Sequence, residues 1–366
     1  MKRIVIDARE YPSSTGRYIR KFLEYLEKID ANSDREYVVL LKSADFDSFQ
    51  PKASNFKKVR ADFKEFTFSE QIGLLRLIRN LKPALVHFGM VQQPVMFTGN
   101  KVTTMHDLTT LRFMNPEKNP TLFKIKQSVY GFVNKRVARS SKAILVPSEF
   151  VKQDVANYTR VNPEKIEVTY ESADKISVPA EEFAPLKNQQ FLMYVGRALP
   201  HKNLMNLIDA FSLIKEKHPL LKLVLVGKKD SHIERHLAYA ASKNIPDVMA
   251  TGYVSEGQLR WLYENTACYC FPSLSEGFGL PSLEAMAHGA PVASSNATCL
   301  PEVNGDAAIY INPTNIQEMA KAISLVLEDQ HLRKELIAKG YEQVKKYSWQ
   351  RMAQETLQVY LKCLSD

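Results

Sequence analysis

The sequence predicts an α/β protein of two domains, each with a parallel β-sheet covered by helices on both faces. Short apolar runs typical of buried strands alternate with amphipathic helical stretches along the chain, and this alternation favours parallel sheets. The chain has 366 residues, which is enough for two domains of ordinary size. Its 45% hydrophobic and 24% charged residues are typical of a globular protein.

The strand-like runs form two series. The first series consists of Arg3–Asp7, Tyr37–Leu41, Lys57–Ala61, Ala84–Phe88, Val102–Met105, Ala143–Pro147 and Ile166–Tyr170. The second consists of Phe191–Gly196, Leu221–Gly227, Val248–Thr251, Cys268–Phe271, Val292–Ser295 and Ala307–Ile311. Amphipathic helices lie between many of these runs, and one has a clear 3.6-residue apolar stripe. That stripe consists of Ile19, Phe22, Leu23, Leu26 and Ile29.

The two series are separated by residues 174–190, which contain two prolines and no hydrophobic period. Such a stretch is typical of a linker. We therefore expect an N-terminal domain over residues 1–170 and a C-terminal domain over residues 186–347. The last segment, residues 348–366, is predicted to be a helix capped by Ser348.

The net charge of +9 is unevenly distributed. Residues 1–180 carry 30 Lys and Arg against 20 Asp and Glu, whereas residues 181–366 carry 19 against 20. A basic half beside a neutral one indicates an anionic partner for the first half.

Cysteine usage and the N-terminus indicate a cytoplasmic protein. Cys268, Cys270, Cys299 and Cys363 have no zinc-type spacing, and we interpret them as small buried side chains in a reducing compartment. No apolar run approaches the ~18 residues of a membrane span. The N-terminus reaches Asp7 after three apolar residues, so we expect a first strand there rather than a signal peptide.

The most informative motif runs from Ser275 to Glu284 and reads SEGFGLPSLE. Pro281 suits a first helical turn, so the amides before it would converge at a positive helix terminus that favours anions. Glu276 lies in the loop, and Glu284 is expected in the first turn. A diphosphate with hydroxyl groups on either side fits this layout, as in a nucleotide-sugar. The alternative is a solvated turn acid and a helix acid that stabilises the dipole.

A second motif follows the strand that ends at Gly196. Arg197 and Lys202 are two cations five positions apart before a helix. Ligands bind at strand carboxyl ends in α/β sheets, where Arg can hold phosphate oxygens as a fork and Lys as a point charge. Two exposed loop cations are the alternative.

In the first half, His106 and Asp107 follow the strand Val102–Met105. A histidine at this position suits hydrogen bonding to a polar substrate, and Asp107 could orient it or face a second substrate. A loop histidine satisfied by local hydrogen bonds is the alternative.

Residues 119–142 contain six cations and no acid. Their apolar stripe consists of Leu122, Ile125, Val129, Val133 and Val137, and their cations are Lys124, Lys126, Lys135, Arg136, Arg139 and Lys142. One interpretation is a helix that packs on the core with a solvated basic face. The other is contact with an anionic membrane surface or an anionic, lipid-linked acceptor. Nucleic acid is not expected, because no recognition module is evident.

Glu276 to Glu284 matches the pattern E-G-F-G-L-P-x-x-E, and in this the chain resembles the retaining glycosyltransferases of family 4. The resemblance covers most of the chain and is stronger in the second half. It implies the GT-B fold, with two Rossmann-like domains facing across a cleft. It also implies that Glu284 holds the donor ribose and that Glu276 lies near the transferred sugar. Arg197 and Lys202 would neutralise the diphosphate, and His106 would contact the donor sugar.

The resemblance extends to further donor-binding positions. It implies that Gly252 and Tyr253 frame the nucleobase and that the loop residues Gly277, Phe278, Gly279 and Leu280 lie along the donor. Gly16 stands where many relatives carry two adjacent glycines, and Thr15 replaces the other one. The final helix is implied to cross back onto the N-terminal domain.

The implied reaction is transfer of a sugar, with retention, from a nucleotide-diphospho-sugar to a glycan or lipid-linked glycan. No cofactor and no metal are expected, because the sequence has no paired aspartates suited to Mg²⁺. The stretch Leu300–Ala308 resembles mannosyltransferases, which favours GDP-mannose over UDP- or dTDP-sugars. The enzyme would act in the cytoplasm, at the inner face of the membrane if the basic helix binds lipid. A nucleotide-sugar epimerase of the same fold and a non-catalytic basic relative that binds membrane or nucleic acid are the alternatives.

Overall fold

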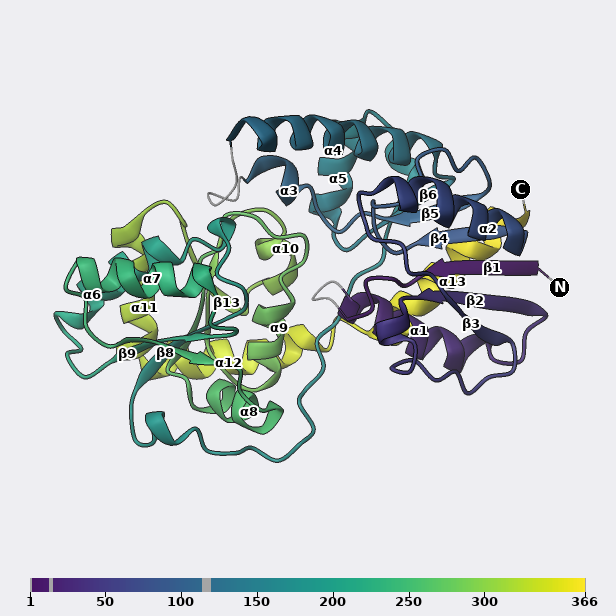
Figure 1. The fold of residues 1–366 in the computed structure, drawn as a ribbon. Helices are drawn as coiled ribbons and strands as arrows, with labels where there is room; N and C mark the ends of the chain where they lie inside the picture. The colour runs from purple at the N-terminus through teal and green to yellow at the C-terminus, as the bar shows by residue number, and fades with distance from the viewer. Residues whose placement is uncertain (1, 13–15, 114–119, 366) are drawn as a thin grey trace. The chain divides into compact units, whose positions relative to one another are not determined.

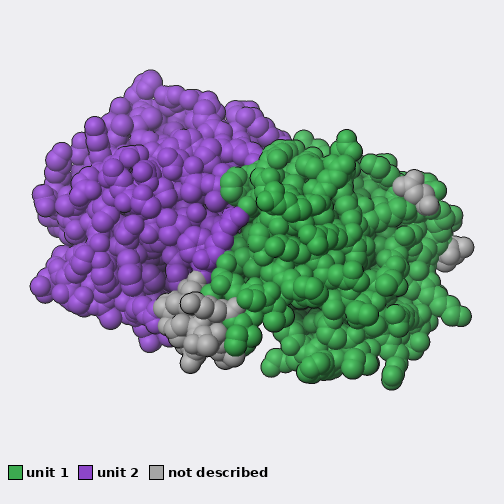
Figure 2. Space-filling view, turned by 90° about the horizontal axis from the view of Figure 1, so that it is seen from above, with its two compact units in different colours: residues 1–111, 119–171, 348–366 green, residues 112–118, 172–347 purple. Residues whose placement is uncertain are grey.

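The computed structural model describes residues 2–12, 16–113 and 120–365, and the chain divides into two compact units. Unit 1 comprises residues 1–111, 119–171 and 348–366, and unit 2 comprises residues 112–118 and 172–347 (Figure 2). Each unit is built around one parallel sheet. The predicted fold class, with two Rossmann-like sheets, is therefore confirmed.

The sheet of unit 1 has the strand order β3-β2-β1-β4-β5-β6-β7. Its strands are β1 (Lys2–Asp7), β2 (Arg35–Leu41), β3 (Phe56–Arg60), β4 (Leu85–Phe88), β5 (Lys101–Thr104), β6 (Ala143–Val146) and β7 (Ile166–Val168). All neighbours pair in parallel, for example Ile4 with Tyr37 on one side and with Leu85 on the other. Each strand falls within one of the predicted runs, give or take one or two residues. The strand order reverses between β1 and β4, which is where sheets of this kind open a crevice for ligands.

Helices cover both faces of this sheet (Figure 1). They are α1 (Gly16–Asp30), α2 (Leu75–Leu81), α3 (Thr109–Arg112), α4 (Pro120–Ser140), α5 (Glu149–Thr159) and α13 (Trp349–Ser365), with short helices η1 (Ser43–Asp45), η2 (Glu70–Leu74, a π-helix) and η3 (Pro163–Lys165). On one face, Ile78 of α2 packs with Val5 and Phe88. On the other face, His87 contacts the rings of Phe22 from α1 and Tyr360 from α13.

Unit 2 repeats the architecture with six parallel strands in the order β10-β9-β8-β11-β12-β13. The strands are β8 (Phe191–Val195), β9 (Lys222–Val226), β10 (Val248–Gly252), β11 (Cys268–Phe271), β12 (Val292–Ser295) and β13 (Ala308–Ile311). The helices are α6 (Leu204–Lys215), α7 (Ser231–Ser242), α8 (Glu256–Asn265), α9 (Leu280–Ala287), α10 (Leu300–Asn304), α11 (Ile316–Glu328) and α12 (Gln330–Val344), with η4 (Ala184–Leu186) and η5 (Pro200–Lys202). Here the order reverses between β8 and β11, so the loops after these two strands lie where sheets of this kind bind ligands.

The predicted core stripe of the basic helix is wrong in its first half. Ile125 and Val129 are 58% and 59% exposed on α4, whereas Val137 is buried. The inward face instead carries Gln127, whose amide donates to the carbonyl of Leu111. Gly131 also faces inward, where an added Cβ would meet the Tyr158 hydroxyl. Asn119, Thr15 and the side chains of Leu122 and Lys124 lie outside the described residues.

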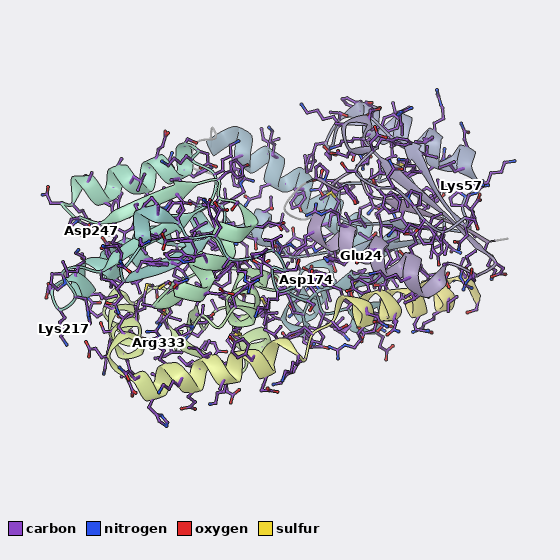
Figure 3. The ribbon with its side chains drawn as sticks, turned by 90° about the horizontal axis from the view of Figure 1, so that it is seen from below. Glu24, Lys57, Asp174, Lys217, Asp247 and Arg333 are labelled. Carbon is purple, nitrogen blue, oxygen red and sulfur yellow. The ribbon has the colours of Figure 1, made fainter. Side chains whose placement is uncertain are left out.

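Many surface charges are paired within each unit. Figure 3 labels Lys57 in unit 1 and Asp247 in unit 2, for example. Lys57 pairs with Glu36 at 2.6 Å, and Asp247 pairs with Lys215 at 2.5 Å. In each pair one side chain is largely buried and the other is exposed to water, and this screening limits the stabilisation to about 1 kcal/mol or less. No helix in the described ranges is long and apolar enough to cross a membrane.

Candidate functional site

The loops after β8 and β11 bring together two of the predicted functional side chains. Nζ of Lys202 lies 2.6 Å from Oε1 of Glu276, and the two side chains are 17% and 11% exposed. The loops are also joined through their backbones, because the N–H of Leu274 donates to the carbonyl of His201 at 2.7 Å. Asn203 adds a third link, since its amide donates to the carbonyl of Pro272 at 3.1 Å. The ion pair is therefore held by two rigid connections beside the strand ends.

The glycine loop after β11 has one required glycine. Gly279 has φ +95°, a conformation that favours glycine, and an added Cβ would lie 2.6 Å from a methyl carbon of Leu300. The next residue begins α9, and the Ser282 hydroxyl bonds back to the Gly279 carbonyl at 2.8 Å. Phe278 is only 4% exposed and packs its ring edge-on against Tyr347. Its ring thus anchors the loop to the ring of Tyr347.

Glu276 is fixed by a neighbouring loop that sequence reasoning did not single out. Its backbone N–H donates to the hydroxyl of Thr298 at 3.1 Å, and its carbonyl accepts from the Cys299 thiol at 3.3 Å. Burial raises the pKa of Cys299 well above its usual value, and the nearby Glu276 carboxylate raises it further. The same two causes act on Tyr194 beneath the loop. The carboxylate of Glu276 thus imposes a negative potential on its surroundings.

Glu284 is held by a buried tyrosine. The sequence predicts Glu284 in the first turn of its helix. In the structure it is the fifth residue of α9, so it lies at the start of the second turn. The hydroxyl of Tyr263 donates to Oε2 of Glu284 at 3.1 Å. Tyr263 in turn stacks on His288, with ring centroids 5.2 Å apart.

His288 has its protonation fixed by its two neighbours. Its Nδ1 lies 2.7 Å from the carbonyl of Glu284, while its Nε2 accepts from the backbone N–H of Ile176 at 3.0 Å. Burial lowers the pKa of His288 to about 4. The neutral ring therefore serves as a fixed support for Tyr263 at physiological pH.

The strand ends on the other side of β8 depend on glycines. Gly227 has φ +150°, and an added Cβ would lie 2.8 Å from the carbonyl oxygen of Gly196. Gly252 has φ +75° and bridges to Gly227. Beyond it, the ring of Tyr253 is 83% exposed. Arg197 is exposed as well, and it forms no ion pair with any residue that the structure describes.

In unit 1, His106 lies after β5 between two hydrogen-bond acceptors. Its Nδ1 is 3.3 Å from Oε1 of Glu171, and its Nε2 is 3.2 Å from the carbonyl of Gly89. Burial by itself lowers the pKa of His106, but the bond to the Glu171 carboxylate overcomes this and raises the pKa above 6.5. The edge of the imidazole packs against Tyr18, with ring centroids 4.9 Å apart. Acceptors on both nitrogens favour the doubly protonated ring.

The other two predicted residues of unit 1 have structural roles. The carboxylate of Asp107 accepts from the backbone N–H of Thr109 at 2.8 Å, so it caps the following turn rather than orienting His106. Gly16 begins α1, where an added Cβ would come 2.3 Å from the carbonyl oxygens of Glu10 and Tyr11. Packing therefore requires glycine at this position, and its donor-binding role stays a prediction.

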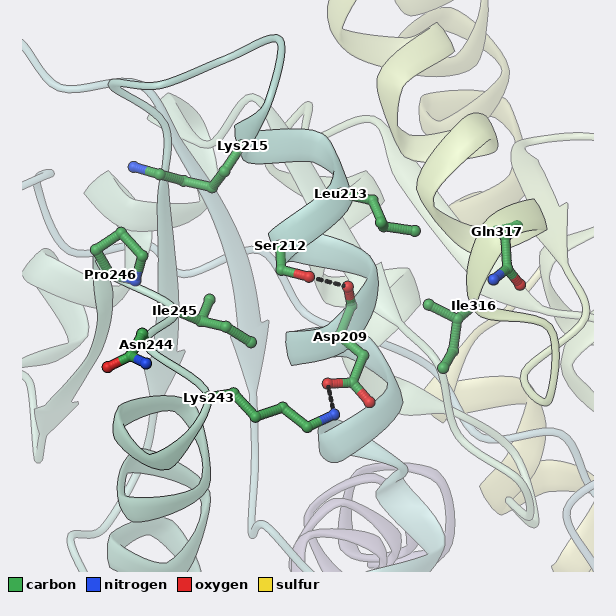
Figure 4. A pocket seen from close by; sticks show the side chains of 10 residues that line it. All are labelled: Asp209, Ser212, Leu213, Lys215, Lys243, Asn244, Ile245, Pro246, Ile316 and Gln317. Carbon is green, nitrogen blue, oxygen red and sulfur yellow. Dashed lines mark hydrogen bonds and ion pairs between the residues drawn. The ribbon is translucent and has the colours of Figure 1, made fainter.

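A separate hollow in unit 2 lies near the amino ends of β9 and β10, away from the loops described above. It has a volume of about 460 Å³ and is lined by residues of α6, by residues 243–246 and by the start of α11 (Figure 4). Lys243 bonds to Asp209 across it at 2.7 Å, so this pair is already neutralised. Among the residues that the structure describes, no group of three His, Cys, Asp or Glu could hold a metal ion.

Two supporting residues were missed by sequence reasoning. Glu171 is 65 positions from His106 in the chain, and Tyr263 lies on a different helix from Glu284. Neither belongs to a local motif, so no spacing signal could have found them. The fold brings Glu171 to His106 near the ends of β7 and β5, and it brings Tyr263 of α8 to Glu284 of α9.

Two protein families match the chain. The family described as glycosyl transferases group 1 matches residues 179–343, and glycosyltransferase family 4 matches residues 34–174. Among curated relatives, the O-antigen chain mannosyltransferase B of Escherichia coli is 29% identical over 71% of this chain and 69% of its own length. The serotype-specific mannosyltransferase WbdA of Escherichia coli is 30% identical over 61% of this chain. The match spans only 29% of WbdA.

Solved structures share the fold over the whole chain. The sucrose-phosphate synthase of Thermosynechococcus elongatus superposes with a TM-score of 0.78 at 17% identity, covering 100% of both chains. Anabaena HepE, solved in complex with UDP and glucose, gives a TM-score of 0.74 at 16% identity and covers 99% of this chain and 100% of its own. Such low identities bear on the fold alone. They show that this chain has the GT-B fold. The two family matches and the mannosyltransferase relatives show that it belongs to the family 4 glycosyltransferases.

Proposed function

We propose that this glycosyltransferase moves a mannosyl group from GDP-mannose to a hydroxyl of a glycan or lipid-linked glycan, with retention of anomeric configuration. The observation that carries the proposal is the ion pair of Lys202 and Glu276 at the carboxyl ends of β8 and β11. A cation and a carboxylate side by side suit a substrate with a diphosphate next to a sugar. The curated mannosyltransferases support the choice of sugar.

Each residue is proposed to act on one part of the donor. Lys202 and Arg197 neutralise the negative charge that develops on the departing nucleoside diphosphate, helped by the amides before α9. Glu276 hydrogen-bonds hydroxyls of the sugar and positions it, and His106 contacts the same sugar. Glu284, oriented by Tyr263, accepts hydrogen bonds from the ribose. The exposed ring of Tyr253 lies next to Gly252, which is proposed to frame the base.

The acceptor hydroxyl is proposed to lose its proton to the leaving phosphate on the face from which the sugar departs. This step retains configuration and gives Glu276 no covalent role. The reaction is proposed to need neither a metal nor a cofactor, since the cations Arg197 and Lys202 supply the positive charge. The acceptor is proposed to be lipid-linked, and residues 119–142 to contact an anionic membrane surface at the inner face of the cytoplasmic membrane.

A thermal-shift panel of GDP-, UDP-, ADP- and dTDP-sugars, run without added metal, tests the donor. A ligand that binds the native state raises the melting temperature by mass action. We expect a rise with GDP-mannose that is lost in the Arg197→Ala/Lys202→Ala variant. A rise with UDP-glucose instead, the molecule with which HepE has been solved in complex, would reassign the base and the sugar. No rise with any donor, in a folded sample, contradicts the proposal.

Turnover separates the transferase from its rivals. An epimerase of the same fold would convert the nucleotide-sugar into another one in the absence of any acceptor. A non-catalytic relative would bind the donor without releasing GDP. We expect GDP release that depends on an added hydroxyl acceptor.

A further inference from the structure

The large apolar side chains that unit 1 exposes, within its described residues, come from three short segments. We call this set the apolar surface, and its members are Phe66, Phe68, Ile72, Met96, Ile125, Val129 and Phe132. They range from 58% to 87% exposed. Scattered apolar residues on a surface are ordinary, but a gathered set marks an interaction site.

Helix α4 contributes three of these residues, because the apolar side chains of its first half face outward. Ile125, Val129 and Phe132 follow one another at i, i+4 and i+7, so they share one outward face. The inward face carries polar groups instead. Asn134 is fully buried with its amide bonded to the Tyr130 carbonyl at 2.8 Å, and the Gln127 amide bonds to a backbone carbonyl. The second half of α4 packs on the core through Val137 and Ala138, so burial orients that half and leaves the aliphatic face of the first half outward.

The segment that displays Phe66 is held in place by a buried ion pair. Arg9 and Glu70 lie 2.9 Å apart with both side chains 2% exposed. The other oxygen of Glu70 accepts from the backbone N–H of Phe66 at 2.9 Å, and Arg9 donates to the carbonyl of Phe63. Phe66 has φ +61°, a costly conformation for a bulky residue. The fold therefore bears strain to present this aromatic ring outward.

Direct contacts tie the three segments into one surface. The rings of Phe66 and Tyr130 lie 6.3 Å apart, which places the first segment against α4. Gln71 donates to the carbonyl of Gln93 at 3.0 Å and accepts from the backbone N–H of Val95 at 2.9 Å, which places the loop of Met96 beside Ile72.

Arginines continue the apolar surface along both helices. On α4, Arg136 and Arg139 follow Phe132 at i+4 and i+7, and both are exposed. In the helix after Phe68, Arg76 and Arg79 follow Ile72 at the same two spacings and are also exposed. Residues 119–142 contain no acid. Apolar side chains bordered by cations on the same face suit the interface of a bilayer with anionic headgroups.

We propose that the apolar surface and its bordering arginines form a docking site for an anionic lipid bilayer, with the aromatic and aliphatic side chains inserted at headgroup depth. The proposal deepens the proposed function and rests on it for its purpose, because a lipid-linked acceptor would be reached from the bilayer. It adds Phe66, Phe68, Ile72 and Met96 to the basic helix as lipid-contacting residues. Long arginine side chains can reach phosphates while their stems stay along the apolar layer.

Vesicle flotation of the full chain tests the docking site. The vesicles contain either phosphatidylcholine alone or a mixture with phosphatidylglycerol. We expect binding to the mixed vesicles that weakens as salt is added. Arg136→Gln/Arg139→Gln should lower the partition coefficient by roughly 25-fold, at about fivefold for each cation. Phe68→Ser/Phe132→Ser should lower it by at least about tenfold at every salt concentration.

Matched controls come from unit 2. Leu220 is 83% exposed outside the apolar surface, so Leu220→Ser should leave the partition unchanged. Lys217→Gln/Lys334→Gln removes two exposed charges in the same unit and should have at most a small effect. Melting temperatures of all variants verify that they are folded.

The outcomes are distinct from those of the proposed function. The docking site is overturned if the folded protein does not bind mixed vesicles, or if both surface variants bind them as tightly as wild type. This holds even if GDP-mannose still raises the melting temperature. Light scattering without lipid provides a second check. A dimer that dissociates in Phe68→Ser/Phe132→Ser would show that a second copy occupies this surface and would also overturn the proposal. Vesicle binding without any donor binding would instead refute the proposed function alone.

Discussion

Replacing Glu276 by glutamine removes a negative charge beside Lys202 while keeping the size of the side chain. In the free protein the two groups are 2.6 Å apart and mostly buried, with exposures of 17% and 11%. Two unit charges 4 Å apart interact by about 4 kcal/mol at an effective dielectric constant of 20. Because water still reaches both groups, we reduce the net interaction to about 1–2 kcal/mol.

A nucleoside diphosphate must compete with Glu276 for the ammonium group of Lys202. Glu276→Gln frees this group, so we expect GDP to bind roughly 5–30-fold more tightly. The same change removes a group proposed to position the sugar, so GDP release from GDP-mannose should fall about 10²–10³-fold. The variant should therefore bind the product better and turn over the donor worse.

Isothermal titration with GDP and with UDP measures the first effect, and a coupled assay of GDP release measures the second. Glu302→Gln is the matched control. It also removes one carboxylate, but from helix α10, and Glu302 has no proposed contact with the donor. Unchanged or weaker nucleotide binding in Glu276→Gln would refute the competition between carboxylate and phosphate. Full turnover in that variant would refute the sugar-positioning role.

Three further effects are expected. Tyr263→Phe removes the hydroxyl that bonds to the Glu284 carboxylate, so donor KM should rise about 3–10-fold with little change in kcat. Steady-state kinetics with no such split would show that Tyr263 acts only in core packing. Glu171→Gln should destabilise the fold mainly below about pH 6.5. The Glu171 carboxylate raises the pKa of His106, so the protonated imidazole stabilises the fold at low pH, and this stabilisation is lost as the pH rises through the folded-state pKa. Melting temperatures that fall equally at pH 5.5 and pH 8.5 would contradict this. Arg160 follows α5 with φ +60°, a conformation that favours glycine, so Arg160→Gly should raise the free energy of unfolding of unit 1 by about 1 kcal/mol in urea. An unchanged free energy of unfolding would show that Arg160 carries no backbone strain.

The sheets could be predicted from sequence because buried parallel strands are nearly continuous apolar runs. Each strand within the described residues matches a predicted run to within one or two residues, and the reversal of strand order follows from the GT-B resemblance. The position of Glu276 beside Lys202 was also within reach, since both follow strand ends that neighbour one another in the sheet. The loop glycines pointed to the same place, and Gly279 does adopt a positive φ.

The orientation of α4 could not be predicted, because periodicity identifies an apolar stripe but not the face that it covers. There the inward side is set by Gln127 and Gly131, which only the tertiary contacts reveal. The partner of His106 was hidden for a similar reason. Glu171 follows β7, and its contact depends on how the strand ends come together rather than on any spacing along the chain.

The last helix has a consequence for how the protein is made. Met352, Thr356 and Tyr360 of α13 are fully buried in unit 1, and the Tyr360 hydroxyl bonds to His87 at 2.5 Å. On a ribosome, β4 and its neighbours leave the exit tunnel long before this helix is synthesised. Unit 2, drawn mainly from residues 172–347, can complete its core first. The sheet of unit 1 is thus translated first, but its core is complete only when α13 has packed on it. Until then the apolar face that α13 covers is exposed and can bind chaperones.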